Sequence, residues 1–397
     1  MAHMRGEDTQ MMEPLVISSG SKHHAELADL AIDLAAKAAG FSRSLPVGIR
    51  ASLADTVRTM NCYYSNLIED HATHPIDIER ALAGDYSADR EKRNLQEEAK
   101  AHVEVQRWID GQGVNGVEVT ASSLCEIHRR FFQLLPDEMR WVEDRVTGER
   151  HRVEPGRLRC RDVVVGRHIP VGWESVPRFL DRFEKVYGRL SKSETIINAA
   201  AAHHRLLWIH PFLDGNGRVA RLMSHAMLLR HLDTGGVWSV ARGLARNADA
   251  YKAHLASCEL PRRNDLDGRG SLSEETLAEF AKFFLKICID QVDFMENLME
   301  PDRLRARLLM WAEEEARIGG LYKKAGQVLE AVLYRGELPR GELPGLLNVT
   351  DRQARRITHQ LVLKGVLAPA LSKEPLRLAF PATLASRFMP GLFPDKF

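Results

Sequence analysis

Apolar and polar positions alternate with the period of an α-helix along most of the chain. In residues 25–40 apolar side chains recur every three or four positions, and a glycine then ends the pattern. Residues 1–20 lack this period, and we expect them to form a tail. The same period predicts further helices over residues 46–69, 87–111, 120–135, 175–190, 194–208, 218–231, 247–258 and 273–297. The chain is therefore predicted to be mainly α-helical.

The helical period is lost between Arg140 and Pro170. The segment CRDVVVGRHIP, residues 160–170, is β-branched and bounded by glycine and proline, which predicts a short β-hairpin or flap. An exposed strand edge there would pair with an extended segment of another protein. The alternative, a hairpin that only covers the core, stays open. The residues expected to line the flap are Arg161, Asp162, Val163, Val164 and Val165.

The C-terminal part has a different organisation. Residues 301–320 are charged and helical and are expected to link two parts of the protein. Beyond them the pattern reads helix, helix, turn, helix and hairpin, with a capping box from Thr350 to Gln353. This order resembles a winged helix-turn-helix module, with residues 366–380 as the wing. The last helix of the module exposes Arg352, Arg355 and Arg356.

A winged helix-turn-helix places such a basic helix in the major groove of DNA. A protein-interaction module that happens to carry arginines is an equally open interpretation. The predicted divisions of the chain are residues 1–20, 21–110, 111–300, 301–320 and 321–397.

Composition narrows the class of protein. Hydrophobic residues make up 44% and charged residues 27% of the 397 residues, as in an average globular protein. The net charge of +1 argues against a chain that is basic throughout. No apolar run approaches the ~20 residues of a membrane span, and the start, MAHMRGEDTQ, has no signal-peptide core. The five scattered cysteines indicate a reducing, cytoplasmic environment and no cysteine zinc site.

The segment HPFLDGNGRVAR, residues 210–221, concentrates the candidate chemistry. Gly215 and Gly217 flank Asn216 just before a predicted helix, where exposed N–H groups and the helix dipole favour an anion. Arg218 and Arg221 are three residues apart, so both guanidinium groups lie on one helical face beside that site.

Two further side chains suit phosphate chemistry. Asp214 is a hard carboxylate next to the anion site, where it would hold a Mg²⁺ ion that bridges phosphates. His210 is a candidate general base. The segment therefore indicates chemistry on a nucleotide phosphate.

This segment resembles the signature of the Fic family, H-x-F-x-[D/E]-G-N-G-R-x-x-R. Members are all-helical domains, and most transfer AMP from ATP to a hydroxyl side chain of a protein. The resemblance therefore implies ATP and a protein target as partners. It implies that His210 deprotonates the target hydroxyl and that Asp214 holds Mg²⁺ on the α- and β-phosphates. Every defined position of the signature matches: His210, Phe212, Asp214, Gly215, Asn216, Gly217, Arg218 and Arg221.

The same resemblance implies how the nucleotide is held. Asn216 and the backbone at Gly215 and Gly217 would hold the α- and β-phosphates, Arg218 the β-phosphate side, and Arg221 the γ-phosphate. A branch of the family that phosphorylates its targets has lysine where this chain has Gly217. That difference favours transfer of AMP.

A second segment resembles the inhibitory motif of many Fic proteins, [S/T]-x-x-x-E-[G/N]. Ser65 and Glu69 lie four residues apart, on one helical face. The resemblance implies that Glu69 pairs with Arg221, occupies the place of the γ-phosphate and leaves ATP misplaced. Asp70 stands where the motif has glycine or asparagine, residues that suit a left-handed helix end. An ordinary solvated glutamate is the alternative.

The sequence thus favours a mainly α-helical Fic enzyme, an adenylyltransferase restrained by Glu69. Family members often place an aromatic residue of the following helix near the adenine, here Tyr251, although core packing is equally open for it. A DNA-binding regulator that senses nucleotide, removal of AMP from a target, and transfer of another nucleotide remain alternatives. Helical Fic cores often pair, so a homodimer is plausible.

Overall fold

A computed structural model describes residues 7–71, 73–112, 119–144, 147–232, 234–368 and 374–394. In these ranges the protein is mostly helical, as predicted, with one small antiparallel sheet. The strands are β1 (Trp141–Glu143) and β2 (Arg150–Arg152). The principal helices are α1 (His24–Ser44), α2 (Val47–Ile68), α3 (Pro75–Leu82), α4 (Arg90–Asp110), α5 (Ala121–Leu134), α6 (Val176–Tyr187), α7 (Lys192–Ile209), α8 (Asn216–Leu232), α9 (Val240–Arg246), α10 (Ala248–Ser257), α11 (Glu274–Met299), α12 (Pro301–Arg317), α13 (Ala325–Arg335), α14 (Leu343–Leu347), α15 (Asp351–Leu363) and α16 (Ala385–Phe388).

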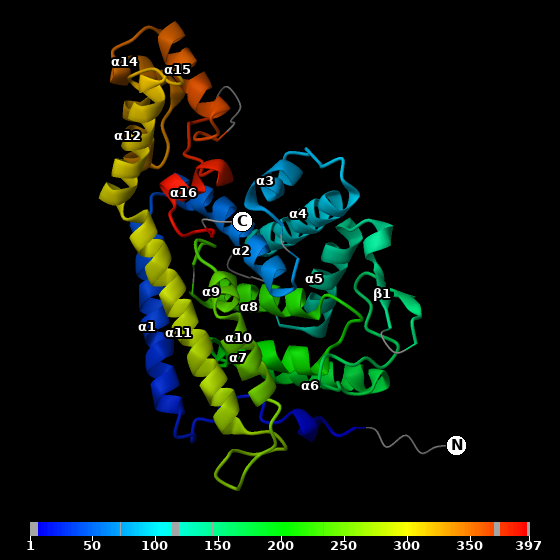
Figure 1. Ribbon diagram of the computed structural model, residues 1–397. Coiled ribbons are helices and arrows are strands. Elements are labelled where there is room, and N and C mark those ends of the chain that lie inside the picture. The colour runs from blue at the N-terminus through cyan, green and yellow to red at the C-terminus, as the bar shows by residue number, and fades with distance from the viewer. Residues whose placement is uncertain are drawn as a thin grey trace.

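Helices α7 and α8 pack against each other in the middle of the main body (Figure 1). The residues from Ala199 to Ala202 are all buried in α7, and such small side chains allow a neighbouring helix to approach closely. A helix that is buried on nearly every side is typical of a protein centre. The loop between these two helices is the segment that the sequence singled out.

Two long helices, α1 and α11, lie side by side along one edge of the molecule (Figure 1). The buried residues of α1 follow the helical period that the sequence predicted. They are the apolar Leu27, Ala31, Leu34, Ala38 and Phe41 and the polar Ser42. At Pro301 the chain passes from α11 into α12, which leads to the C-terminal module.

The predicted tail is wrong for residues 7–20. Met12 and Leu15 are buried, and Ile17 donates its backbone N–H to the Asn198 side chain of α7 at 2.9 Å. The Tyr187 hydroxyl donates to the Leu15 carbonyl. The apolar residues of this segment cover α6 and α7, so they contribute to the core. Residues 1–6 lie outside the described range.

The predicted hairpin is also misplaced. Both strands lie upstream, in β1 and β2, and segment 160–170 contains only an isolated bridge between Val165 and His168. The reason is tertiary: Arg159 donates its backbone N–H to the Pro211 carbonyl at 2.9 Å, and His168 contacts the Trp208 carbonyl at 2.8 Å. These contacts hold the segment as a loop on α7, despite its β-branched residues.

The C-terminal module has the predicted order of helices, α13, α14 and α15. Thr350 and Gln353 form both halves of the capping box. Part of the predicted wing, residues 369–373, lies outside the described residues, and the rest shows isolated bridges from Leu338 to Leu376 and from Leu367 to Leu378. The winged-helix assignment stays a prediction.

The last described segment contacts the main body. The Tyr64 hydroxyl of α2 donates to the Leu392 carbonyl at 3.0 Å, and Arg242 of α9 donates to the Gly391 carbonyl at 2.8 Å. Helix α12, which we expected to be a linker, itself packs against α13 and α16. The module is therefore joined to the main body at more than one place.

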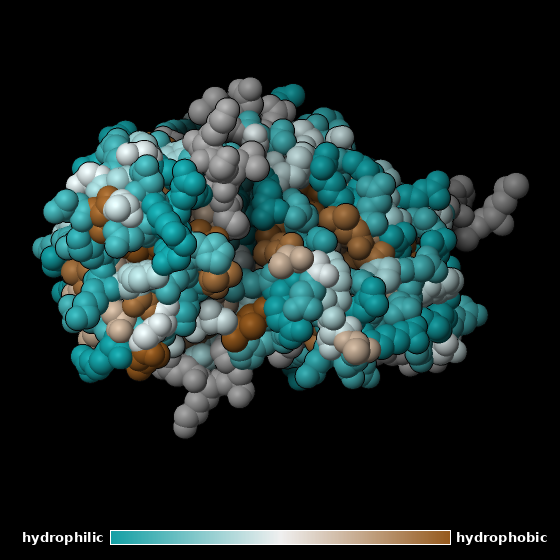
Figure 2. Space-filling model, turned by 90° about the horizontal axis from the view of Figure 1, so that it is seen from above, coloured by the Kyte–Doolittle hydropathy of each residue, from teal (hydrophilic) through white to brown (hydrophobic). Residues whose placement is uncertain are grey.

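Seen from above, hydrophobic side chains lie singly or in small groups on a mostly hydrophilic surface (Figure 2). Such scattered apolar residues are normal for a globular protein. Among the described residues, no helix combines the length and the apolar character that a membrane crossing requires.

Candidate active site

The turn after α7 is held by its own asparagine. The Asn216 side chain accepts the Phe212 N–H at 2.9 Å and donates to the Phe212 carbonyl at 2.9 Å. Phe212 is fully buried, and its ring stacks on His128 with centroids 4.1 Å apart. Because both polar atoms of the Asn216 amide bind the backbone of Phe212, this side chain shapes the turn.

Glycine is required at position 215, directly before Asn216 in the turn. Gly215 has φ +79°, and a Cβ there would lie 2.6 Å from the Phe132 ring. This close packing brings the loop directly to the N-terminus of α8, which begins at Asn216, two residues earlier than the sequence predicted. The first N–H groups of a helix lack intrahelical partners, so they favour an anion.

His210 ends α7 in a left-handed conformation, with φ 51°. Its carbonyl accepts the Nε–H of Arg159 at 2.8 Å. Burial, together with the charges of Arg159 and His168, lowers the pKa of His210 to about 4. The imidazole is therefore neutral near pH 7, the form in which it accepts a proton.

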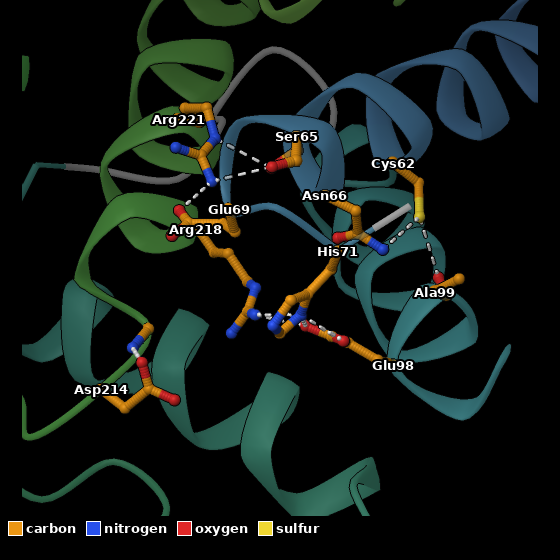
Figure 3. A network of polar contacts seen from close by, with 11 residues as sticks. Cys62, Ser65, Asn66, Glu69, His71, Glu98, Ala99, Asp214, Arg218 and Arg221 are labelled. Atoms are coloured by element: carbon orange, nitrogen blue, oxygen red, sulfur yellow. Dashed lines mark hydrogen bonds and ion pairs between the residues drawn. The ribbon is translucent and has the colours of Figure 1, made fainter. Parts of the chain in front are cut away.

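Arg221 meets both residues of the predicted inhibitory motif (Figure 3). Its Nε–H donates to the Ser65 hydroxyl at 2.9 Å, and its Nη2 donates to the Ser65 carbonyl at 3.2 Å. The same Nη2 is 2.5 Å from Glu69 Oε1. The predicted pairing between the end of α2 and the second arginine of the turn is thus present in the structure.

Glu69 reaches the start of α8 because position 217 has no side chain. A Cβ on Gly217 would overlap Glu69 Oε1, a contact that real Cβ atoms do not make. Burial raises the pKa of Glu69, but the charges of Arg221 and Arg218 outweigh it and hold that pKa below its usual value. The carboxylate is therefore ionised at neutral pH and occupies the place where the helix favours an anion.

Asp70 adopts the left-handed conformation that the motif requires, with φ 62°. The next residue, His71, donates its N–H to the Asn66 carbonyl at 2.9 Å and so closes the end of α2. The departure from glycine or asparagine at this position changes the residue but leaves the backbone shape in place.

Arg218 has a carboxylate partner that the sequence analysis missed. Its Nη2 forms an ion pair with Glu98 Oε1 and lies 3.3 Å from His71 Nδ1 (Figure 3). The guanidinium also stands over the Phe131 ring, 5.1 Å from its centroid. Glu98 is placed by α4 and is buried. The sequence did contain a signal for Glu98: it stands on the apolar face of its helix, and a charge on such a face needs a partner.

Asp214 is the acidic residue of the turn. Its Oδ1 accepts the Gly215 N–H at 2.6 Å. Among the described residues, no group of three or more histidine, cysteine or acidic side chains could hold a metal ion. A Mg²⁺ ion that arrives with phosphates needs only one or two protein carboxylates, so a single aspartate fits that mode of binding.

The predicted flap residues lie in the loop that Arg159 anchors beside the turn. Arg161 contacts His151 Nε2 at 2.6 Å, and Asp162 accepts the Trp173 N–H at 2.9 Å. The valines face outward in part, with Val164 68% and Val165 40% exposed, and Val163 is half-buried. The segment therefore exposes apolar side chains on a loop that Arg159 joins to the His210 carbonyl, and it does not form a strand.

Tyr251 lies in the interior. It is buried, and its hydroxyl is 2.6 Å from His203 Nε2, whose Nδ1 is 2.9 Å from the Ser224 hydroxyl. Burial raises the pKa of Tyr251 to about 12. Of the two interpretations of Tyr251, this position supports core packing.

The basic residues of the C-terminal module are separate from this site. Arg352, Arg355 and Arg356 are exposed on α15, which lies at the end of the molecule away from α7 and α8 (Figure 1). With Tyr322 and His359 they line a shallow cavity of 850 Å³. The structure places these arginines together on one open face.

The chain resembles known proteins over this region. The Fic/DOC family model matches residues 118–228. The chain is 33% identical over 126 residues to the protein adenylyltransferase Fic of Drosophila erecta, and 32% identical over 174 residues to that of Nematostella vectensis. These matches cover 31% and 42% of this chain but only 22% and 36% of those relatives.

The fold has a relative among solved structures. A Fic family protein from Desulfovibrio desulfuricans G20 matches 92% of this chain and 98% of its own, with a TM-score of 0.52 and 16% sequence identity. That likeness supports a common fold. The residues that match the Fic/DOC family model, 118–228, include the turn between α7 and α8.

Proposed function

We propose that the protein is an adenylyltransferase that transfers AMP from ATP to a Ser, Thr or Tyr hydroxyl of a protein target. One observation carries the proposal: the turn from His210 to Arg221 is preformed at the N-terminus of α8. It brings a neutral imidazole, an anion-binding helix end and two guanidinium groups together. The adenylyltransferase names of the relatives from Drosophila erecta and Nematostella vectensis support it.

In this proposal each part of the turn has a chemical role. The N–H groups at the start of α8, with Arg218 and Arg221, bind the phosphates. His210 takes the proton of the target hydroxyl, whose oxygen then bonds to the α-phosphorus. The bond from that phosphorus to the bridging oxygen of the β-phosphate breaks, and pyrophosphate leaves. Asn216 contributes by holding the shape of the loop.

Asp214 would hold the Mg²⁺ ion that accompanies ATP. When bound, such an ion neutralises charge on the phosphate oxygens. The aspartate stands immediately before the anion site, and Gly215 donates its N–H to one of the carboxylate oxygens. This contact fixes the orientation of the carboxylate before any ligand arrives.

We further propose that Glu69 restrains the enzyme. Its carboxylate lies against Gly217 and pairs with Arg221 at 2.5 Å, so a nucleotide phosphate and Glu69 compete for one place. Like charges in that place repel each other. Movement of the end of α2 would free Arg221, and residues 161–165 would then present the target hydroxyl to His210.

The test uses ATP labelled on the α-phosphate, with ATP labelled on the γ-phosphate in parallel. Wild type, Glu69→Gly, and Glu69→Gly with His210→Ala are compared for labelling of themselves and of proteins in a cell extract. We expect the Glu69→Gly samples to incorporate at least about tenfold more α-label than wild type. Adding His210→Ala should abolish this incorporation.

Asp70→Asn is the matched control. It removes the neighbouring carboxylate while keeping a residue that tolerates the left-handed conformation, and it should label like wild type. Transfer of the γ-label, or α-labelling that survives His210→Ala, would contradict the proposal. Parallel reactions with labelled UTP and with AMP-modified protein test the alternatives of another donor and of AMP removal.

A second candidate function rests on α15. Its exposed arginines Arg352, Arg355 and Arg356 lie on one face of a helix that begins with a capping box. Binding of duplex DNA through this face would weaken steeply with salt. A gel shift of the full chain against the variant with all three arginines changed to alanine tests it, and equal binding by both proteins would exclude this face.

A further inference from the structure

The buried carboxylate of Glu98 is not used by the proposed chemistry, yet it contacts the arginine at the centre of the site. Glu98 is 1% exposed. Oε1 pairs with Arg218, and Oε2 is 2.9 Å from His71 Nδ1. An isolated buried carboxylate is costly, so these two partners account for the position of Glu98 inside the protein.

We propose that Glu98 is a positioning residue that holds the Arg218 guanidinium in the orientation that receives a nucleotide phosphate. This inference rests on the proposed function. An arginine side chain has several rotatable bonds, and a free one loses rotamer entropy when it binds. Glu98 on one side and the Phe131 ring 5.1 Å from the guanidinium remove that freedom before the ligand arrives.

The geometry leaves donors of Arg218 for a ligand. The contacts of this guanidinium with Glu98 and His71 both involve Nη2. Within the described part of the chain, the buried Nε has no hydrogen-bond partner. A guanidinium has five N–H donors, so the ion pair orients the group without saturating it.

A purely structural role explains this arrangement less well. A buried ion pair gains little net stability, because desolvation offsets the attraction between the charges. Its main physical effect is geometric: it fixes where the charged groups point. Arg218 comes from the first turn of α8, so fixing its guanidinium sets the charge beside the anion site.

His71 connects this pair to the inhibitory end of α2. His71 lies two residues after Glu69, and its backbone N–H donates to the Asn66 carbonyl, which closes the helix. Its ring lies against Glu98 and Arg218 (Figure 3). Displacement of Glu69 therefore disturbs His71, while the Arg218–Glu98 pair, built on α8 and α4, stays. The arginine remains positioned as the carboxylate competitor leaves.

The experiment uses the full chain with Glu69→Gly, to which Glu98→Gln is added. ATP binding is measured by calorimetry, and transfer kinetics by the α-label. We expect the Kd and KM for ATP to rise about tenfold, with a smaller change in kcat, because a charge-assisted contact is misdirected. Adenosine, which has no phosphate, should bind both proteins equally.

Two further variants separate positioning from folding. Glu97→Gln alters the adjacent, partly exposed glutamate of α4, which pairs with Arg93, and should leave Kd and KM unchanged. Glu98→Asp keeps the charge on a shorter side chain. Its KM for ATP should lie above that of the Glu69→Gly parent and below that of the protein with Glu98→Gln. The rise over the parent can be measured even if Glu98→Gln does not fold.

The outcomes distinguish the two proposals. Unchanged KM for ATP in Glu98→Asp, or equal weakening of ATP and adenosine, would overturn the positioning role. Glu98-dependent ATP binding without any transfer of label would instead retain the positioning role and remove the proposed function.

Discussion

Arg218 and Arg221 lie three residues apart on one helix, and each meets a carboxylate from a different helix. The Arg218–Glu98 pair is buried on both sides, with side chains 8% and 1% exposed. In the Arg221–Glu69 pair the arginine is 3% exposed, but the glutamate is 33% exposed. One carboxylate is part of the interior, and the other stands at its edge.

The backbone is also more constrained around Glu98 than around Glu69. Glu98 lies in the middle of α4, whereas Glu69 is the C-cap directly after α2 and is followed by a left-handed Asp70. Arg221 also binds Ser65 through Nε at 2.9 Å, so it keeps a partner when Glu69 leaves. Under the proposed function, this difference makes Glu98 a permanent partner of Arg218 and Glu69 a removable competitor at Arg221.

The largest effect expected from this difference concerns stability. Replacing Glu98 by alanine leaves Arg218 buried without a carboxylate and should lower the free energy of unfolding by about 3–5 kcal/mol. Replacing the partly exposed Glu69 by alanine should cost about 1 kcal/mol or less. Urea unfolding of the two variants measures both, and equal losses would contradict the distinction.

The next effect concerns nucleotide affinity. Gly217→Ala places a methyl group where Glu69 Oε1 lies, so the carboxylate must leave Arg221. A phosphate that takes the place of Glu69 would meet the same methyl group, so we expect the Kd for ATP, measured by calorimetry, to rise about tenfold, or about 1.4 kcal/mol. In a Glu69→Gly background the same substitution should also weaken ATP binding. Unchanged binding there would show that the phosphate does not lie against Gly217.

The sequence showed one of these two pairs and missed the other for a physical reason. Ser65, Glu69 and the turn at His210 stand in short motifs, so their residue types and spacing carried the prediction. Glu98 and His71 act through contacts between segments distant in sequence. Only the placement of a charge on the buried face of α4 pointed to Glu98, and nothing pointed to its partner.

The local elements divide in a similar way. Helical periodicity predicted α1 and α2, because their apolar stripes face the core. It missed the short α3, which begins at Pro75, and α9. The β-branched run Val163–Val165 suggested a strand, but contacts to α7 and to the turn hold it as a loop. Tertiary contacts there override local propensity.

A smaller effect is expected at the end of α2. Asp70 has φ 62°, a conformation that glycine adopts without steric cost. Asp70→Gly should therefore raise the free energy of unfolding by about 0.5–1 kcal/mol. Because it stabilises the helix cap beside Glu69, the Asp70→Gly protein should also show less residual α-labelling than wild type. Asp70→Val should do the reverse on both measurements, and stabilisation by valine would refute this account of the cap.

The smallest effect is a pH dependence that belongs to the permanent pair. The carboxylate of Glu98 raises the pKa of His71 above its usual value, against the opposing effects of burial and of the Arg218 charge; Glu69 adds a smaller raising effect. Since the folded pKa exceeds the unfolded value of about 6.5, the charged His71 stabilises the fold below that pH. This contribution is lost as the pH rises through the folded pKa.

The His71 side chain is 43% exposed, so solvent screening limits the effect to about 0.5 kcal/mol. Urea unfolding of wild type and of His71→Gln, measured from pH 5.5 to pH 9, tests this. Wild type should be the more stable protein at the acidic end, and the difference should shrink as the pH rises. A difference that grows with pH would mean that His71 stabilises the cap as a neutral ring, and that the Glu98–His71 contact is not an ion pair.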